Sequence, residues 1–398
     1  MVKKDRQHNC YTLAYPKKML PTFYQTHLQK QLAPAQFILL TVLLNLIQLE
    51  KQVRLERLAR VFPYPITTES RRRKIQRFLD LPNLTISLIW FPLITYWLIT
   101  YCRVGQTLSR SIDRSQWGQI NLFMVSLIWE RRAIPLYWSL LPKLGNSNFE
   151  LQTTNLEQVL PLFSKYKVIV LGNREFCSVD LGNWLREKGV SFCLRLKKNH
   201  CIETEHLVWQ RLDRLGIVPG TSLYFQGKRV RKTQPATGFD VACKCQRNYG
   251  AWTVDEAWFI LTDLGSLPAA INAYKQRMGI EEMFRDCKTG GYDLEGTSLK
   301  GDRLINMILL MTLAYSSAIF QGTEQKKKQV QKYVSRRKEP KKKYRRRSTF
   351  GVGLDGEKWV NYLEQYSLEV EQLMKLTPSK RRFYQQGMRA ATLIQSIS

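Results

Sequence analysis

The sequence predicts a mixed α/β core that carries a β-rich insertion and follows an all-helical N-terminal region. Apolar residues recur at helical spacing over residues 35–80, strand-like runs begin near residue 105, and strands and helices then alternate. The chain has 398 residues, of which 44% are hydrophobic, so it is long enough to bury a sizeable core in two or three domains. Wholesale disorder is excluded by this apolar fraction.

The net charge indicates a polyanionic partner. The chain has 62 Lys and Arg residues against 32 Asp and Glu residues, which gives a formal charge of +30 at pH 7. Self-repulsion of this size destabilises a compact state unless anions relieve it, so nucleic acid or an acidic membrane is the expected partner. The N-terminus lacks the apolar stretch of a secretory signal, and the eight cysteines lack framework spacing, which favours reduced thiols in the cytoplasm.

Two other interpretations of the sequence are weaker. Residues 84–102 are uncharged over 19 positions, which is long enough for a membrane span, but polar residues and a proline interrupt them as in a buried helix. We therefore expect no membrane partner. Several thiols and imidazoles could bind zinc, although no C-x-x-C pair is present; they are Cys193, His200, Cys201, His206, Cys243 and Cys245.

Residues 1–104 form the predicted helical DNA-binding region. Within residues 53–79, an amphipathic helix ends at Pro63, a turn follows, and Thr67 or Thr68 can cap a second helix. This is the outline of a helix-turn-helix with a turn longer than the usual three or four residues. The second helix would contact DNA, or would carry an ordinary solvated face, through four basic residues: Arg71, Arg72, Arg73 and Lys74.

Residues 105–320 form the predicted core. A three-stranded meander comes first, then helices and buried strands alternate, which gives the order βββαβαβ of an α/β core of the ribonuclease H type. The expected strands cover 105–117, 120–130, 133–143, 166–172 and 191–198, and the expected helices cover 153–164 and 179–187. A β-rich insertion follows at about 199–262, and then a helix at 268–288.

The chain is predicted to end in a basic arm and a helical segment. Residues 326–347 hold 13 Lys or Arg in 22 positions, so we expect residues 321–350 to be a mobile linker arm that contacts phosphates instead of packing. A solvated linker and an RNA-binding tail are the alternatives. Residues 351–398 form the predicted C-terminal helical segment.

Four residues on the helix predicted at 268–288 form a candidate site. Tyr274, Arg277, Glu281 and Lys288 have offsets of 0, 3, 7 and 14. At about 100° per residue they fall within a wedge of roughly 60°. Neither a core face nor an alternating salt-bridge face has this composition. It suits a site where one acid holds a cation while nearby donors grip phosphate oxygens.

This Y-x2-R-x3-E-x6-K pattern resembles the signature of the DDE transposases of bacterial insertion sequences, in the YREK or insertion sequence 4 group. The resemblance covers residues 50–350 and implies a ribonuclease H-like fold in which Glu281 is the third catalytic acid. Asp113, in the opening strand, corresponds to the first. The second acid belongs to a run that reads LGNREF at 171–176, so Asn173 stands where the resemblance implies aspartate.

The resemblance also implies a metal centre. Two Mg²⁺ ions, with Mn²⁺ as a substitute, would be held by Asp113, Asn173 and Glu281. An amide oxygen at position 173 contributes no charge, so strand cleavage in this copy is expected to be impaired. Glu175 or Asp180 could act in place of the missing acid.

The implied DNA contacts come from the same helix and from the insertion. Arg277 and Tyr274 would bind the phosphate near the cut, and Lys288 would contact the DNA backbone. The resemblance also implies that a tryptophan of the insertion stacks on a flipped base, and Trp252 is the candidate, because Trp258 alternates like a core residue in a strand.

The implied function is cut-and-paste DNA transposition in the bacterial cytoplasm, at the nucleoid. The partners would be the terminal inverted repeats of the element, target DNA and a second copy of the chain, because two DNA ends need two sites. The alternative is a catalytically inactive DNA-binding relative that acts as a partner or repressor of transposition.

Overall fold

The computed structural model describes residues 20–204, 208–246, 256–336 and 347–397. The chain divides into two compact units, Lys30–Ser316 on one side and Met1–Gln29 with Ser317–Ser398 on the other. Each unit is described by itself below. The division into four domains that the sequence predicts stays a prediction.

The first part of the larger unit is built from helices. They are α2 (Pro34–Glu50), α3 (Leu55–Val61), α4 (Thr68–Leu79) and α5 (Phe91–Tyr101), with a π-helical turn at Ile86–Trp90 before α5. α1 (Thr22–Gln31) precedes them. The predicted pair of helices within 53–79 is present, and the Thr67 side chain caps α4 by accepting a hydrogen bond from the backbone N–H of Ser70.

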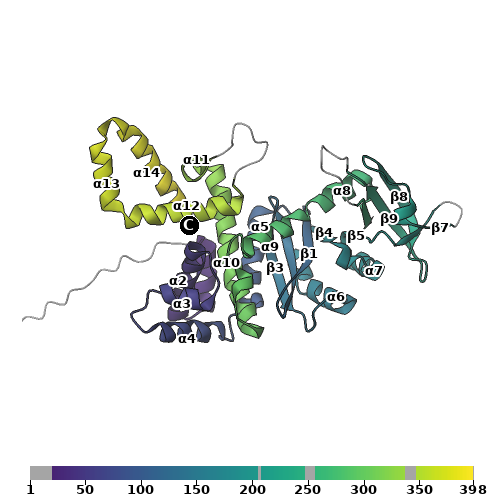
Figure 1. Cartoon of the computed structure of the whole chain (residues 1–398), viewed down its shortest axis with the longest axis horizontal. Coiled ribbons are helices and arrows are strands. Elements are labelled where there is room, and N and C mark those ends of the chain that lie inside the picture. Colours follow the sequence, from purple (N-terminus) through teal and green to yellow (C-terminus); the bar gives the residue numbers. More distant parts are fainter. Residues whose placement is uncertain (1–19, 205–207, 247–255, 337–346, 398) are drawn as a thin grey trace, which may run out of the picture. The chain divides into compact units, whose positions relative to one another are not determined.

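A ten-stranded mixed sheet follows these helices in the larger unit (Figure 1). Its strand order is β3-β2-β1-β4-β5-β10-β9-β8-β6-β7. β1 pairs in parallel with β4, and β4 pairs in parallel with β5, whereas the other pairs are antiparallel. The strands are β1 (Thr107–Trp117), β2 (Ile120–Trp129), β3 (Arg132–Leu140), β4 (Lys167–Gly172), β5 (Ser191–Arg195), β6 (Cys201–Glu203), β7 (Trp209–Arg211), β8 (Ser222–Val230), β9 (Ala236–Lys244) and β10 (Trp258–Thr262).

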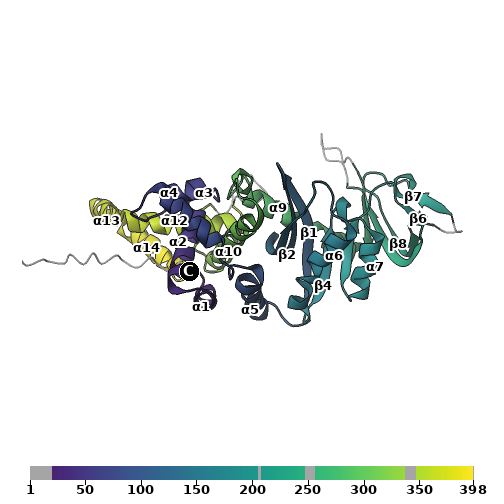
Figure 2. The ribbon, with the colours of Figure 1, turned by 90° about the horizontal axis from the view of Figure 1, so that it is seen from below.

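The predicted succession βββαβαβ is confirmed, because α6 (Phe149–Glu157) lies between β3 and β4 in the chain and α7 (Val179–Glu187) between β4 and β5. The strands of the predicted insertion do not form a separate layer. They continue the core sheet, since β10 pairs with β5 and carries β9 and β8 outward. Figure 2 shows β8, β6 and β7 beyond β4, on the side away from β2.

The helix predicted at 268–288 is two helices, α8 (Leu267–Lys275) and α9 (Met278–Cys287), so that prediction is corrected. The backbone tightens between them: the N–H of Arg277 bonds to the carbonyl of Tyr274, three residues back instead of four. Gly279 then allows α9 to approach β3 closely, because a Cβ there would lie 3.1 Å from the carbonyl carbon of Arg132. The four signature residues therefore do not share one helical face.

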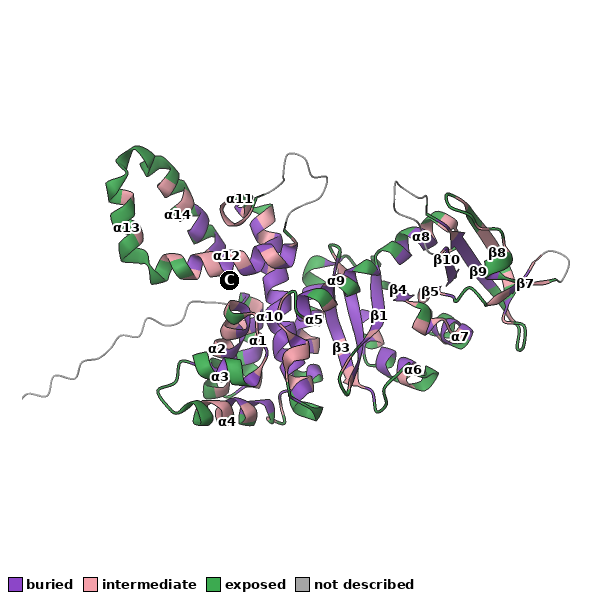
Figure 3. Ribbon diagram, in the orientation of Figure 1, coloured by how far each residue is buried: buried purple, intermediate pink, exposed green. Residues whose placement is uncertain are grey.

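One helix, α10 (Gly301–Lys327), is long and apolar enough to cross a membrane by length and composition, and 83% of its most apolar window is buried inside the protein. Core helices pass the same test. The segment considered as a span from the sequence forms the shorter apolar helix Ile86–Tyr101, in which Leu93 and Leu98 are buried. Figure 3 shows the central strands and much of α10 as buried.

The smaller unit contains the end of α10, α11 (Gln331–Val334), α12 (Thr349–Gln365), α13 (Ser367–Leu376) and α14 (Arg381–Gln395). The expectation that residues 321–350 form a mobile arm that does not pack is wrong up to residue 336. Val330 is 4% exposed and belongs to a cluster with Val360 and Ile394. Apolar residues between the lysines give this part a face that can be buried. Residues 337–346 lie outside the described part of the chain.

Candidate active site

Asp113, within β1, and Asn173, directly after the end of β4, lie side by side. The register pairs Ile112 of β1 with Gly172, the last residue of β4, so Asn173 leaves the sheet next to Asp113, where β1 continues to Trp117 along β2. The Oδ1 atom of Asn173 accepts a hydrogen bond from the N–H of Glu175 at 2.8 Å. The Nδ2 atom therefore faces Asp113 and donates to its Oδ1 at 2.8 Å.

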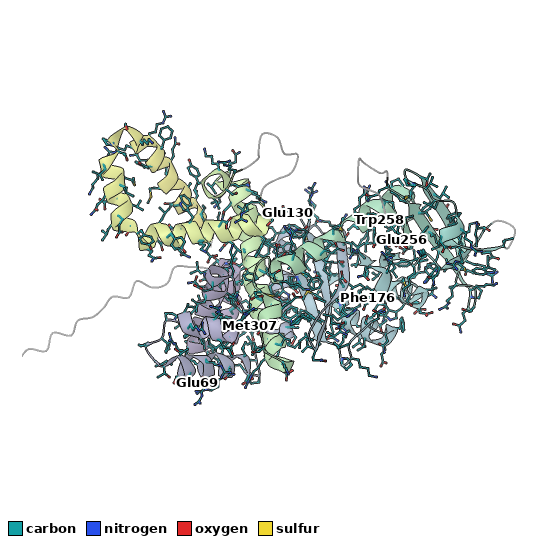
Figure 4. The ribbon with its side chains drawn as sticks, in the orientation of Figure 1. Glu69, Glu130, Phe176, Glu256, Trp258 and Met307 are labelled. Carbon is teal, nitrogen blue, oxygen red and sulfur yellow. The ribbon has the colours of Figure 1, made fainter. Side chains whose placement is uncertain are left out.

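The turn after β4 is held in place by its neighbours. A Cβ at Gly172 would lie 2.8 Å from the Cβ of Phe176, so only glycine fits this close return of the chain. The next residue, Arg174, pairs through Nη1 with Glu256 at 2.5 Å. Glu256 lies beside Trp258 at the start of β10 (Figure 4), which ties the turn to that strand.

Contacts with β3 orient α9. The Nη1 atom of Arg132 lies 2.6 Å from Oε2 of Glu282 and 3.3 Å from Oδ2 of Asp286. These two acids are four residues apart and share one face of the helix. With Gly279 against the same arginine, the rotation of α9 is fixed, and Glu281 is brought toward Asp113.

Arg277 bridges the two acids from the link between α8 and α9. Its Nη1 atom lies 3.2 Å from Oδ2 of Asp113, and its Nη2 atom pairs with Oε1 of Glu281. Arg277 and Asp113 are buried, whereas the Glu281 side chain is 44% exposed. The Arg277 guanidinium also lies 5.7 Å from the ring centre of Tyr274.

The pKa of Asp113 is raised to about 6, mainly by burial. The N–H of Arg114 and the charge of Arg277 oppose this rise, and the charges of Glu281 and Glu175 add to it. The site therefore holds its first acid at a pKa close to the range in which enzymes operate.

The donor set fits one divalent cation and not two. The Arg277 guanidinium stands between the Asp113 and Glu281 carboxylates, so a single cationic group can be shared by both. A second ion would need a carboxylate at position 173, and neutral ligands hold hard cations poorly. In the described residues, no group of three or more His, Cys, Asp or Glu side chains is arranged to hold a metal ion.

Neither substitute acid is available to this site. Glu175 accepts two hydrogen bonds from Nε of Arg114, at 2.9 and 3.0 Å, and two more from the N–H and Oγ of Ser147. Asp180 lies on α7, where both carboxylate oxygens are 2.9 Å from Nη1 of Arg231. Both carboxylates already have structural partners.

The remaining signature residues lie at different distances from the acids. The Tyr274 ring is buried and packs edge-on against Trp258, with 5.2 Å between ring centres. Trp258 is partly buried against a core cluster, in keeping with its prediction as a core residue. Lys288 follows the end of α9, and its ammonium pairs with Glu295 at 2.6 Å. Trp252 lies outside the described residues.

The basic residues of α4 divide into two kinds. Arg71 donates from Nη1 to the carbonyls of Arg60 and Phe62, at the end of α3, and so holds the turn together. Arg73 points outward with 66% of its side chain exposed. Arg72 pairs with acids of α3 and α4, and Lys74 lies 4.7 Å from the ring centre of Tyr64.

Two of the thiols considered as zinc ligands are core residues. Cys193 and Cys243 are fully buried in β5 and β9, and burial raises the pKa of each to about 12, so both stay protonated. His206 lies outside the described residues.

Sequence reasoning missed Arg132 and the Arg114–Glu175–Ser147 contacts. Arg131 and Arg132 are adjacent in the sequence, and nothing in their local pattern shows which of them turns inward. The available signal was the spacing of Glu282 and Asp286, four residues apart on one face of α9, which indicates a basic residue packed against that face.

A family model matches the middle of the chain. Residues 149–317 match the family described as "Transposase DDE domain", a segment that includes Asn173 and Glu281 and leaves out Asp113. The match covers less than half of the chain and shows a likeness to the transposase domain within that segment. No curated protein matches the chain.

Among solved structures, the fold is similar to that of the piggyBac transposase in a synaptic complex with hairpin DNA. The two chains are 9% identical, the similarity covers 87% of this chain and 78% of that chain, and the TM-score is 0.43.

Proposed function

We propose that this chain, whose residues 149–317 match the DDE transposase domain, is a DNA transposase that acts on the terminal inverted repeats of its own element. The family match and the formal charge of +30 support DNA as the substrate. Membership of the YREK group, which we propose from Tyr274, Arg277, Glu281 and Lys288, would imply cut-and-paste movement.

We also propose that strand cleavage is impaired in the chain as written. The observation that carries this proposal is the hydrogen bond from Nδ2 of Asn173 to Asp113. An amide hydrogen stands where a cation would need an acceptor oxygen, and the amide oxygen is already engaged by Glu175. Loss of one electrostatic contact of this kind typically costs about 10²–10³ in rate.

The residues of the chain have separable tasks in this proposal. Asp113 and Glu281 would hold one Mg²⁺ or Mn²⁺, which supplies activation of a water or 3′ hydroxyl when bound. Arg277 and Tyr274 would donate hydrogen bonds to a phosphate of the DNA strand. Arg114 orients Asp113, since its backbone N–H donates to Oδ1 at 2.8 Å.

The test compares the chain as written with Asn173→Asp on a DNA fragment that carries the sequences flanking this gene. With Mg²⁺ or Mn²⁺, we expect the aspartate form to cut the ends and the written form to bind them with little cutting. Equal cutting by both forms would contradict the assignment of position 173. A random duplex of the same length is the control for end recognition.

A second candidate function is that of a non-catalytic DNA-binding relative, a partner or repressor of transposition. Asn173 favours it, because binding does not need the missing carboxylate. If Asn173→Asp also binds ends and does not cut them, this second function is the better account.

We further propose that the protein works as a homodimer bridged by two DNA ends, in the cytoplasm at the nucleoid and without a membrane partner. Light scattering with and without the end-bearing duplex tests the dimer. A mass that stays that of one chain on DNA would contradict it.

A further inference from the structure

We propose that Arg277 is an exchangeable counter-ion that couples the binding of a DNA phosphate to the binding of a divalent cation. This inference rests on the proposed function. In the DNA-free protein the guanidinium neutralises Asp113 and Glu281. A phosphate that draws the guanidinium away frees both carboxylates for the cation.

Both carboxylate oxygens of Asp113 already have partners in the DNA-free protein. Its Oδ1 atom accepts hydrogen bonds from the Asn173 amide and from the N–H of Arg114, both at 2.8 Å, and its Oδ2 atom lies 3.2 Å from Nη1 of Arg277. A divalent cation cannot join this arrangement while Arg277 stays, because two positive groups would share the same two acids at short range. Cation binding therefore requires Arg277 to move.

The Arg277 side chain can move without unfolding the site. α9 is anchored independently by Arg132, through Glu282 and Asp286. α8 is anchored by Ala270 and other side chains packed into a core cluster. Arg277 lies in the link between these helices, so a rotation of its side chain leaves both in place.

A hydrogen-bond donor that a phosphate could use, the Tyr274 hydroxyl, belongs to the residue three positions before Arg277. The Tyr274 side chain is buried, and its hydroxyl finds no hydrogen-bond acceptor within the described part of the chain. The charges of Arg277 and Arg195 both act to lower the pKa of this tyrosine against the effect of burial. The Arg277 guanidinium, 5.7 Å from the ring centre of Tyr274, and the hydroxyl of that tyrosine suit one anionic oxygen, such as that of a phosphate.

Linkage makes the coupling reciprocal. If the duplex raises the affinity for the cation by some factor, the cation raises the affinity for the duplex by the same factor. Couplings between binding sites are typically on the order of 5- to 150-fold. We expect at least about tenfold here, since both acids are released together.

The experiment titrates Mn²⁺ into the full chain and follows the loss of the free-ion signal by electron paramagnetic resonance. It is done without DNA and with the duplex that carries the flanking sequences. For the chain as written, we expect the duplex to raise Mn²⁺ affinity about tenfold or more. For Arg277→Gln, we expect Mn²⁺ affinity to be raised already without DNA, and to change little when DNA is added.

Arg285→Gln is the matched control. It removes the same charge from α9, the helix that follows Arg277, at a residue that pairs with Glu282, so it should keep the written chain's behaviour. If Arg277→Gln loses its circular dichroism signal, Arg277→Lys replaces it. A lysine keeps the charge without bridging two carboxylates, and it should give an intermediate Mn²⁺ affinity.

The inference is overturned if either Arg277 variant, folded and without DNA, binds Mn²⁺ no better than the written chain. A DNA effect on Mn²⁺ affinity that survives in Arg277→Gln would overturn it as well. Failure of the proposed function gives a different result, namely equal binding of the flanking duplex and a random duplex, whereas the DNA-free titration still decides the role of Arg277.

Discussion

The Asn173 side chain donates a hydrogen bond of 2.8 Å to the carboxylate of Asp113, where β4 ends beside β1. The Asn173 amide is neutral and its hydrogen bond to Asp113 has a normal length, so this contact stabilises the metal-free site. A carboxylate at the same position would face Asp113 with a second negative charge. With asparagine at position 173, the metal-free site is therefore more stable than it would be with aspartate, and its affinity for a cation is lower.

Asn173→Asp should destabilise the protein when cations are removed by a chelator. The lost hydrogen bond and the new like-charge contact together cost about 1–3 kcal/mol. Mg²⁺ or Mn²⁺ should restore the stability, because a ligand that binds only the folded state stabilises it. Thermal unfolding with chelator and with Mn²⁺ measures both effects. An aspartate variant as stable as the written chain in chelator would argue against this view.

Glu175→Gln should destabilise the protein whether or not metal is present. The side chains of Glu175 and Arg114 are 11% and 15% exposed, and breaking a buried pair typically costs about 3–5 kcal/mol. Asp180→Asn is the control: its pair with Arg231 is more exposed, so the loss should stay below about 1 kcal/mol. Denaturant unfolding compares the two. Similar losses would show that Glu175 is not a structural anchor.

The resemblance to the transposase signature was sufficient to group Asp113, Asn173 and Glu281. The structure places Asp113 within β1 and Asn173 directly after β4, next to it in parallel pairing, and Arg277 links Asp113 to Glu281. The spacing of the signature could not reveal the break at Arg277, because the tightened turn depends on the close packing of Gly279 against β3.

The continuous sheet was also beyond sequence reasoning. Alternation of polar and apolar residues identifies β8 and β9 as strands. It does not show which strand edge β10 pairs with, because β5 lies far from β10 in the sequence. The basic tract after α10 was misjudged for a related reason. Charge counting ignored Val330, whose burial depends on α12 and α14, far along the chain.

Two buried arginines should respond in opposite ways to replacement by methionine. Arg110 is fully buried over the ring of Phe163, and its guanidinium nitrogens find no hydrogen-bond partner among the described residues. Arg110→Met should therefore stabilise the protein by about 1–4 kcal/mol. Arg132→Met should destabilise it by about 3–5 kcal/mol, since it leaves Asp286 buried without its partner.

Denaturant unfolding of both arginine variants checks this pair of predictions. A loss of stability in Arg110→Met comparable to that in Arg132→Met would mean that Arg110 has an anionic partner in solution.

The stability of the smaller unit should fall as the pH rises from about 5 to 8. Burial raises the pKa of Glu357 to about 8, well above the value of an exposed glutamate, and both carboxylate oxygens lack partners in the described part of the chain. The folded state thus holds a proton that the unfolded state has released, so stability is lost through this range. Glu357→Gln should remove this loss, as calorimetry at several pH values would measure. An unchanged pH dependence in the variant would count against a buried, protonated Glu357.

The basic residues of α4 should separate into a structural group and a DNA-contacting group. Arg73→Gln removes an exposed charge, so it should weaken binding to all duplexes about equally and reduce the slope of log affinity against log salt by about 1. Arg71→Gln removes hydrogen bonds to the carbonyls that end α3, so it should lower stability by about 1–3 kcal/mol.

Fluorescence anisotropy over a salt series, together with thermal unfolding, measures both arginine variants of α4. Arg73→Gln should keep its unfolding midpoint, because its partner Glu69 is also exposed and such pairs contribute little. A salt slope unchanged in Arg73→Gln would mean that α4 does not meet the phosphates. Arg71 holds the turn between α3 and α4. If Arg71→Gln binds DNA less tightly at higher temperature, the loss of binding should therefore occur over the same temperature range as its thermal unfolding.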